Sequence, residues 1–318
     1  MEKDIAQAPQ KAQRTHVAFR TAGRKLWKYR AYYVLMLPAV IYVAIFCYVP
    51  MYGLQIAFKD YRPVLGYLGS PWVGLKHFVS FFQGAYFWML LRNTLALTLY
   101  SLIAGFPIPI VLALLLNEVN QKFRKVSQTI LYAPHFISVV VLVGIMKLVF
   151  SPSIGLVNNA LELLGMERIY FMVSPSAFPH LYVWSGIWQE MGWSAVIYIA
   201  ALAGVDPGLH EAARIDGASR MQRILHINLP AILPTIMILL IMWIGSLVSV
   251  GYEKIYLMQN DLNIQVSEVI STYVYKRGII NTNYSFSTAV GIFNNVVNII
   301  LLVLANAFSK KVSETGLF

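Results

Sequence analysis

A carboxylate stands in the middle of one of the longest apolar segments of the chain. Glu190 lies eleven residues into segment 179–203, which is about 16 Å along a helix that rises ~1.5 Å per residue. An ionisable group near the middle of a membrane is costly, so it is a candidate for function by default. Three polar or aromatic side chains lie beside it or on the same helical face: Trp188, Gln189 and Trp193.

Two later apolar segments, 233–257 and 285–308, also carry polar side chains at helical spacing. Hydroxyl, carboxylate and amide groups hydrogen-bond a hydroxyl-rich ligand such as a sugar, and aromatic rings pack on its C–H faces. We therefore predict a substrate path lined by Trp188, Gln189, Glu190, Trp193, Trp243, Ser246, Ser249, Tyr252, Glu253, Asn294 and Asn298. We expect four of these to share one internal cavity: Glu190, Trp193, Ser249 and Asn294.

Each of these features also has an interpretation that involves packing alone. Stripes of Asn, Ser and Gly hold helices together in membranes. Glu190 can pair inside the protein with a basic group such as Lys147. For Glu190 and for the asparagines, the sequence leaves both substrate contact and helix packing open.

A second candidate site lies in segment 204–232, which is far longer than the ~2–8 residues usual between helices of a bundle. Asp206-Pro207 is an N-cap followed by proline at the first helical position. The short helix that follows, over 208–216, ends at Gly217. Ser219 and Gln222 form a capping-box pattern that begins a second short helix, and we expect Pro230 to end it. Glu211 projects from the first helix among small and apolar residues, Leu209, Ala212, Ala213 and Ile215.

Metal binding and ATP hydrolysis by this chain are not expected. His210-Glu211 is the first half of a His-Glu-x-x-His zinc motif, but position 214 is arginine, and the six histidines show no other ligand spacing. The dipeptide Gly-Lys never occurs, so the chain lacks the Walker A motif of P-loop ATPases. We predict no catalytic residue, no metal site and no cofactor bound by this chain.

The composition indicates the class of protein to which these residues belong. Of 318 residues, 58% are apolar and only 12% are charged, and the mean hydropathy is +0.61. A soluble protein needs about 25% charged residues, so a soluble enzyme and a disordered chain are disfavoured. One cysteine, Cys47, excludes a disulfide framework within the chain. The net charge is +11, and eight Lys and Arg lie in the first 30 residues, but this stretch lacks a basic face interleaved with aromatics and so does not indicate nucleic-acid binding.

Six apolar segments are long enough to cross a membrane: 32–57, 89–116, 129–150, 179–203, 233–257 and 285–308. Segments 1–31, 117–128, 204–232 and 309–318 carry 16 Lys and Arg, whereas the alternate connections carry 6. Because basic residues stay on the cytoplasmic side, we predict that both termini are cytoplasmic. The predicted organisation is all-α: a basic segment 1–31, a six-helix transmembrane domain 32–308 with the loop 204–232 on its cytoplasmic side, and a tail 309–318. Pro107 and Pro109 should kink the second span, and a short external helix is expected over 156–164.

The loop also carries the residues of a known motif. Glu211-Ala212-Ala213, three residues, Gly217, nine residues, Ile227, one residue and Leu229-Pro230 resemble the EAA signature of binding-protein-dependent ABC importer permeases. The polysaccharide and complex-oligosaccharide branch of that family has similar outer motifs. They are Pro50-Met51-Tyr52-Gly53, Trp72-Val73-Gly74-Leu75, Leu131-Tyr132-Ala133-Pro134-His135-Phe136-Ile137-Ser138, Ser267-Glu268-Val269-Ile270 and the C-terminal Gly316-Leu317-Phe318.

The resemblance implies a multi-pass permease subunit of the bacterial inner membrane, surrounded by lipid. Its partners would be a second EAA-type permease, two cytoplasmic ATPases that bind ATP and Mg²⁺, and an extracytoplasmic sugar-binding protein. The loop would be the coupling helix, which implies ATPase contact by Glu211, Ala212, Ala213, Asp216 and Gly217. Transport would proceed by alternating access. Two rivals are a secondary transporter or channel that acts alone and an integral membrane enzyme.

Overall fold

The computed structural model describes residues 27–246 and 251–313, and the chain divides into two compact units, Met1–Gln55 and Ile56–Phe318. The described part of the first unit consists of α2 (Arg30–Val43), the π-helical η1 (Ala44–Tyr48) and most of the 3-10 helix η2 (Val49–Phe58). This stretch corresponds to the predicted first span. The predicted segment 1–31 lies almost wholly outside the described residues, as does the end of the tail 309–318.

The second unit is helical throughout its described residues, where the only extended pairing is an isolated bridge between Lys59 and Trp72. In its first half the elements are α3 (Gly66–Gly69), α4 (Lys76–Phe82), α5 (Phe87–Gly105), α6 (Pro107–Glu118), α7 (Gln121–Tyr132), η3 (Ala133–Phe136), α8 (Val139–Val149) and α9 (Leu156–Leu163). They continue with α10 (Ala177–Leu202), α11 (Pro207–Ile215), α12 (Arg220–Arg223), η4 (Ile224–Asn228), α13 (Leu229–Ile244), α14 (Tyr252–Met258), α15 (Ile264–Ser267), α16 (Ile270–Tyr275), η5 (Lys276–Ile280) and α17 (Tyr284–Ser313).

The all-helical, multi-span class predicted from the sequence is confirmed. Among the described residues, four helical stretches are long and apolar enough to cross a membrane: Arg30–Phe58, Phe87–Glu118, Arg220–Ile244 and Tyr284–Lys311. Two bent pairs pass the same test together. They are Gln121–Phe136 with Val139–Val149, bent by 99°, and Ala177–Leu202 with Pro207–Ile215, bent by 76°. Six spans result when each bent pair counts as one. The second span is interrupted at Phe106, next to Pro107, and α9 forms where a short helix was expected.

The prediction of the third span as one helix over 129–150 is wrong. The helix breaks between α7 and α8, with the 3-10 turn η3 between them. Pro134 has no N–H to donate to a helical hydrogen bond. Ser138 then begins α8 as an N-cap, because its hydroxyl accepts the N–H of Val141 at 3.3 Å.

The predicted boundaries of the fifth span are also wrong. The second short helix, capped at Ser219, does not end at Pro230. It continues through η4 into α13, and α13 ends at Ile244 rather than at residue 257. The wider hydrogen-bonding of the π-helical η4 gives the backbone room to accommodate Pro230, which cannot donate an N–H. A separate helix, α14, begins at Tyr252.

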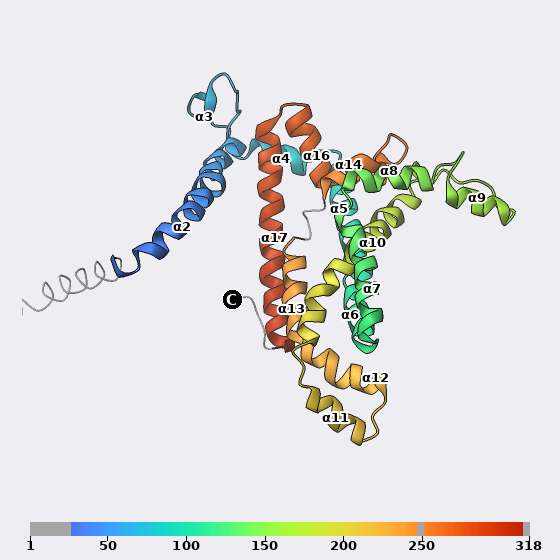
Figure 1. Cartoon of the computed structure of the whole chain (residues 1–318). Coiled ribbons are helices and arrows are strands. Elements are labelled where there is room, and N and C mark those ends of the chain that lie inside the picture. The colour runs from blue at the N-terminus through green and yellow to red at the C-terminus, as the bar shows by residue number, and fades with distance from the viewer. Residues whose placement is uncertain (1–26, 247–250, 314–318) are drawn as a thin grey trace, which may run out of the picture. The chain divides into compact units, whose positions relative to one another are not determined.

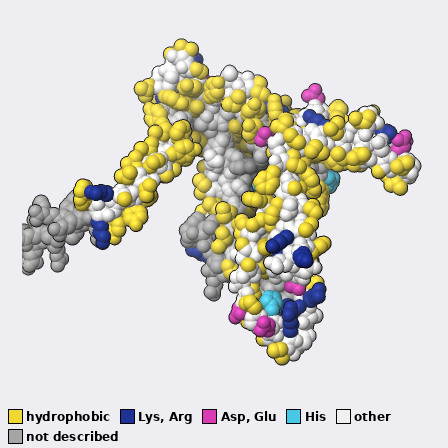
Figure 2. Space-filling model, in the orientation of Figure 1, with side chains coloured by type: hydrophobic (Ala, Val, Ile, Leu, Met, Phe, Trp, Pro, Cys, Tyr) yellow, Lys and Arg dark blue, Asp and Glu magenta, His cyan; other side chains and the backbone are white. Residues whose placement is uncertain are grey.

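The second unit packs around α10, which contacts α5, α6, α7, η3 and α13 (Figure 1). On the other side of α13, α17 packs against α13 and α4. Hydrophobic side chains cover most of the visible surface of these long helices, whereas charged side chains gather over α11 and α12 at one end (Figure 2). That distribution suits a bundle in lipid with one polar helical loop outside it.

The contact between α10 and α7 depends on Gly192. A Cβ placed there would overlap the backbone carbonyl of Leu131, and backbone cannot move away as a flexible side chain can. We expect Gly192→Ala to destabilise the protein by about 1–3 kcal/mol, as overpacked substitutions do. The measurement is the thermal unfolding midpoint of the purified protein in detergent. The matched control is Gly144→Ala, because a Cβ at Gly144 has open space within 4 Å; equal midpoints for the two variants would contradict the expectation.

Candidate functional site

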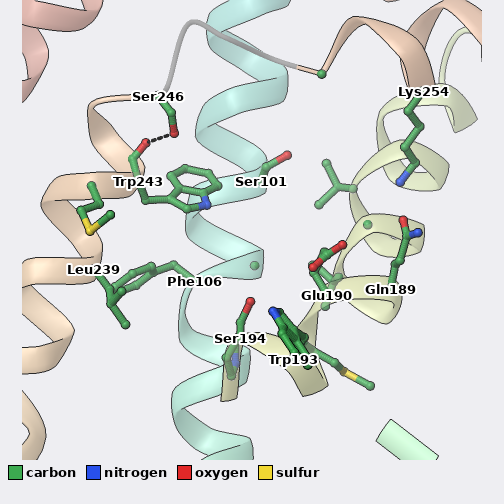
Figure 3. A pocket seen from close by; sticks show the side chains of 18 of the residues that line it. Ser101, Phe106, Gln189, Glu190, Trp193, Ser194, Leu239, Trp243, Ser246 and Lys254 are labelled. Carbon is green, nitrogen blue, oxygen red and sulfur yellow. Dashed lines mark hydrogen bonds between the residues drawn. The ribbon is translucent and has the colours of Figure 1, made fainter. Parts of the chain in front are cut away.

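A cavity of about 900 Å³ lies between α10 and its neighbours (Figure 3). One wall is α10, from Tyr182 to Tyr198. The opposite wall comes from Ser101 of α5, from Phe106 between α5 and α6, and from α13 with Leu239 and Trp243. Most of the lining is apolar or aromatic, with a few polar groups among it, which is the usual make-up of a small-molecule site.

Six of the predicted substrate-path residues line this cavity: Gln189, Glu190, Trp193, Trp243, Ser246 and Glu253. They come from segments distant in sequence, α10 on one side and the end of α13 with the beginning of α14 on the other. The carboxylate of Glu190 and the indole of Trp243 face the same hollow in Figure 3. The hydroxyl of Ser246 donates to the carbonyl of Trp243 at 2.9 Å, so it is occupied within its own turn.

The structure pairs Glu190 with His135, not with Lys147. Nδ1 of His135 lies 2.9 Å from Oε2 of Glu190. Since an ionised carboxylate only accepts hydrogen bonds, that ring nitrogen donates. The imidazole also stacks on the indole of Trp193, with centroids 4.6 Å apart and planes 2° from parallel. Both contacts hold side chains of α10 against η3, so Glu190 and Trp193 are fixed in position while half exposed.

The side-chain amide of Gln189 is used for packing, although the residue lines the cavity. Its Nε2 donates to the carbonyl of Ile137 at 2.7 Å, in the break before α8. The residue is buried. The amide therefore joins α10 to the broken span and leaves its oxygen as the group for any further contact.

Four predicted residues lie elsewhere, and one falls outside the described part. Trp188 is exposed and outside the cavity lining, and Tyr252 stacks on Tyr275. Asn294 and Asn298 are on α17, which packs on α13 and α4, so neither is in the cavity lining. The expectation that Asn294 shares the cavity is therefore corrected, and Ser249 lies outside the described residues.

The cavity also includes a cation that the sequence reasoning passed over. Lys254, on α14, lines the cavity and its Nζ donates to the carbonyl of Tyr182 at 3.0 Å. It lay inside the predicted segment 233–257 but only three residues from its end, so it was not at the mid-membrane depth that selected Glu190. His135 also lay inside a predicted span, 129–150, but its pairing with Glu190 could not be predicted because it depends on the break in that span.

The loop of the second candidate site has the local structure predicted for it. Asp206 caps α11 by accepting the N–H of Gly208 at 2.9 Å, and Gly217 ends the helix with φ +77°. Both hydrogen bonds of the capping box between Ser219 and Gln222 are present. Glu211, Ala212, Asp216 and Gly217 are exposed, and Ala213 is half-buried. The exposed residues of α11 include a large apolar side chain, Ile215, which is 87% exposed.

Comparison with known proteins assigns the family. Residues 105–314, which include both the cavity helices α6 to α14 and the loop of α11, match the family described as "Binding-protein-dependent transport system inner membrane component". The chain belongs to this family. It is therefore a multi-pass component of the inner membrane and the membrane subunit of a transporter, a permease rather than a hydrolase.

Similar proteins within this permease family cover nearly the whole chain. The polygalacturonan/rhamnogalacturonan transport system permease protein YteP of Bacillus subtilis is 46% identical over 295 residues, 92% of each chain. Protein LplB of the same organism is 46% identical over 287 residues, 90% of each chain. A chain of a bacterial ABC transporter that imports the acidic polysaccharide alginate has a TM-score of 0.86 and 41% identity over 92% of this chain and 99% of its own.

The geometry around Trp193 predicts a role in the permease that Trp188, five residues earlier on α10, does not share. We expect Trp193→Ala to lower transport about threefold to tenfold, because it removes a ring face held at the cavity by His135. Trp188→Ala should leave transport unchanged, since that ring is outside the lining. The measurement is uptake by the reconstituted transporter, with the yield of assembled complex as the control. Equal losses for both variants would contradict the role of the cavity.

Proposed function

We propose that this permease imports an oligosaccharide or a fragment of a polysaccharide that an extracytoplasmic binding protein delivers. The observation that carries the proposal is the cavity beside α10. Its volume of about 900 Å³ is at the upper end of the ~300–1,000 Å³ of small-molecule sites. A cavity of this volume has room for part of a sugar chain and is much larger than a single ion needs. The rings of Trp193 and Trp243 and the carboxylate of Glu190 supply the contacts that sugars use.

The relatives support the same class of cargo. One transports polygalacturonan or rhamnogalacturonan, two others transport arabinooligosaccharides, and the similar solved structure belongs to an importer of alginate. A second solved structure of that importer, 42% identical with a TM-score of 0.86, is in complex with a periplasmic protein that holds an alginate pentasaccharide. These cargoes are those of the related proteins. For this chain, the proposal of an oligosaccharide cargo depends on the cavity.

The proposed partners are two ATPase subunits and a second permease of the same family. The surface for an ATPase is α11, with Glu211, Ala212, Ala213, Asp216 and Gly217. Two small alanines permit close approach, Ile215 offers an apolar side chain to bury, and Glu211 accepts hydrogen bonds or pairs with a cation. With α11 on the cytoplasmic side, the distribution of Lys and Arg supports cytoplasmic termini as part of the proposal. ATP with Mg²⁺ would bind to the partners, not to this chain.

The proposed cycle is alternating access. Closure of the ATPases would move α11, and α11 joins α10 at Leu202 and the Arg220–Ile244 helix at its other end. Because α10 and α13 both line the cavity, movement of this loop would change the walls of the cavity directly. This connection supplies a physical route from ATP hydrolysis to the opening and closing of the path.

The proposal as a whole is tested by uptake of a labelled oligosaccharide into proteoliposomes that contain the complex co-purified with this chain. Uptake should require both internal ATP and the binding protein. Uptake by this chain alone, without ATP, would contradict the proposal and favour a solitary transporter.

The coupling role of α11 predicts that Glu211→Lys and Gly217→Val uncouple hydrolysis from uptake or release the ATPase. Removal of the Glu211 carboxylate would leave hydrogen-bonding groups of the ATPase unpaired, and each unpaired group costs ~1–3 kcal/mol. Valine is poorly tolerated at a φ of +77°, so it would redirect the end of α11. The measurement is ATPase activity with and without loaded binding protein, alongside uptake.

Matched controls lie in the loop after α9. Gly165 has nearly the same backbone conformation, φ +75°, and open space around it, so Gly165→Val imposes the same strain elsewhere. Glu167→Lys reverses another exposed carboxylate. If the α11 variants retained wild-type assembly, stimulated hydrolysis and uptake, the assignment of α11 as the coupling helix would be wrong.

A further inference from the structure

The ammonium group of Lys254 extends from α14 to α10 and ends at the cavity. Nζ lies 3.0 Å from the carbonyl oxygen of Tyr182 and 5.0 Å from the centroid of the Tyr182 ring. A Cβ on Gly186 would lie only 3.2 Å from Nζ. The missing side chain at Gly186 therefore makes the space in which the ammonium sits. In Figure 3, Lys254 points toward the same hollow as Glu190.

The hydrogen-bonding capacity of this ammonium is only partly used. An ammonium has three N–H donors, and the carbonyl of Tyr182 takes one. The ion pairs between described residues are Asp60 with Arg62, Glu190 with His135, Glu162 with Arg168, and Glu268 with Lys276. Lys254 is in none of them. Glu190 attracts Lys254 electrostatically, but the two do not form an ion pair. A cation at membrane depth without a directly paired carboxylate is costly, and such residues mark ion or substrate pathways.

Neither acidic side chain of the cavity forms a direct ion pair with Lys254, although Glu190 attracts it electrostatically. Glu190 receives a hydrogen bond from His135, and Glu253, the next residue to Lys254, is exposed and lines the cavity. Gly186, beside the ammonium, precedes Glu190 by one helical turn, ~6 Å along α10. The cavity thus presents a hydrogen-bond donor with positive charge and, one turn further on, a carboxylate that only accepts.

We infer that Lys254 binds a carboxylate of the cargo, and that the oligosaccharide proposed above is therefore an acidic one that contains uronate residues. In a uronate ring the carboxylate on C5 lies across the ring from the hydroxyls on C2 and C3. With the carboxylate at Lys254, those hydroxyls lie toward Glu190 and donate to it, and the ring lies near the indole of Trp193. A neutral sugar would supply no carboxylate to form an ion pair with Lys254.

The position along the path is consistent with this role. Tyr182 and Gly186 belong to the first half of α10, the half that is farther from α11. In the orientation proposed above, cargo that enters from outside meets Lys254 before it meets Glu190 and Trp193. The ammonium would select for negative charge at entry and form a charge-assisted hydrogen bond with it.

The test uses trigalacturonate and its neutral methyl ester with the complete complex and its binding protein, in proteoliposomes with internal ATP. We expect Lys254→Gln to lower uptake of trigalacturonate about tenfold to hundredfold, the loss expected for a hydrogen bond to a charged group. Lys254→Arg, which keeps the charge, should retain most of the uptake. Lys147→Gln removes an exposed cation on α8 outside the cavity lining and should change nothing.

Several results would overturn the inference. The first is wild-type uptake of trigalacturonate by the Lys254→Gln variant. The second is an equal loss of uptake in the Lys254→Gln and Lys254→Arg variants together with a lower thermal midpoint, because that combination indicates a structural role. The third is a wild-type complex that imports only the methyl ester, or imports the ester as fast as the acid. A wild-type complex that imports no oligosaccharide at all in the presence of ATP would refute the proposed function itself.

Discussion

The break in the third span and its contact with α10 are the constraint on which the site depends. A helix that stops inside apolar surroundings leaves backbone carbonyls without partners, at ~1–3 kcal/mol each. The amide of Gln189 satisfies the carbonyl of Ile137, and the missing side chain of Gly192 lets α10 approach the carbonyl of Leu131. These two contacts hold one side of α10 against the broken span, next to the side chains that line the cavity.

The side chains that could bind cargo are held by the same contact. Glu190 and Trp193 follow Gln189 on α10, and both meet His135, which η3 carries into the break. A carboxylate and an indole that are already oriented lose little conformational entropy when a ligand binds, and such preorganisation increases affinity. The broken span thus contributes to the site a histidine that a continuous helix would have placed differently.

Glu268, a buried charge of the second unit, has a different set of partners. Glu268 accepts from the hydroxyl of Thr272 at 2.9 Å and from the ammonium of Lys276 at 2.6 Å. Its backbone carbonyl accepts from the amide of Asn93 at 3.0 Å. This charge is fully partnered and joins α5 to α16, as buried charges generally require. Lys254 contrasts with it, because its partner is a carbonyl rather than a carboxylate.

The features that the sequence predicted correctly depend on interactions between residues close together in the chain. Apolar length identified the membrane-spanning class, and Asp206, Gly217 and Ser219 set the ends of the short helices through caps and a positive φ that depend on near neighbours. The break at η3, the pairing of Glu190 with His135 and the position of Lys254 were decided only by the tertiary structure. Each joins residues more than 50 positions apart, as His135 and Glu190 are, or depends on a carbonyl that finds its partner on another helix. Hydropathy and helical spacing report the face of one helix, and they contain no information about which neighbouring backbone that face must satisfy.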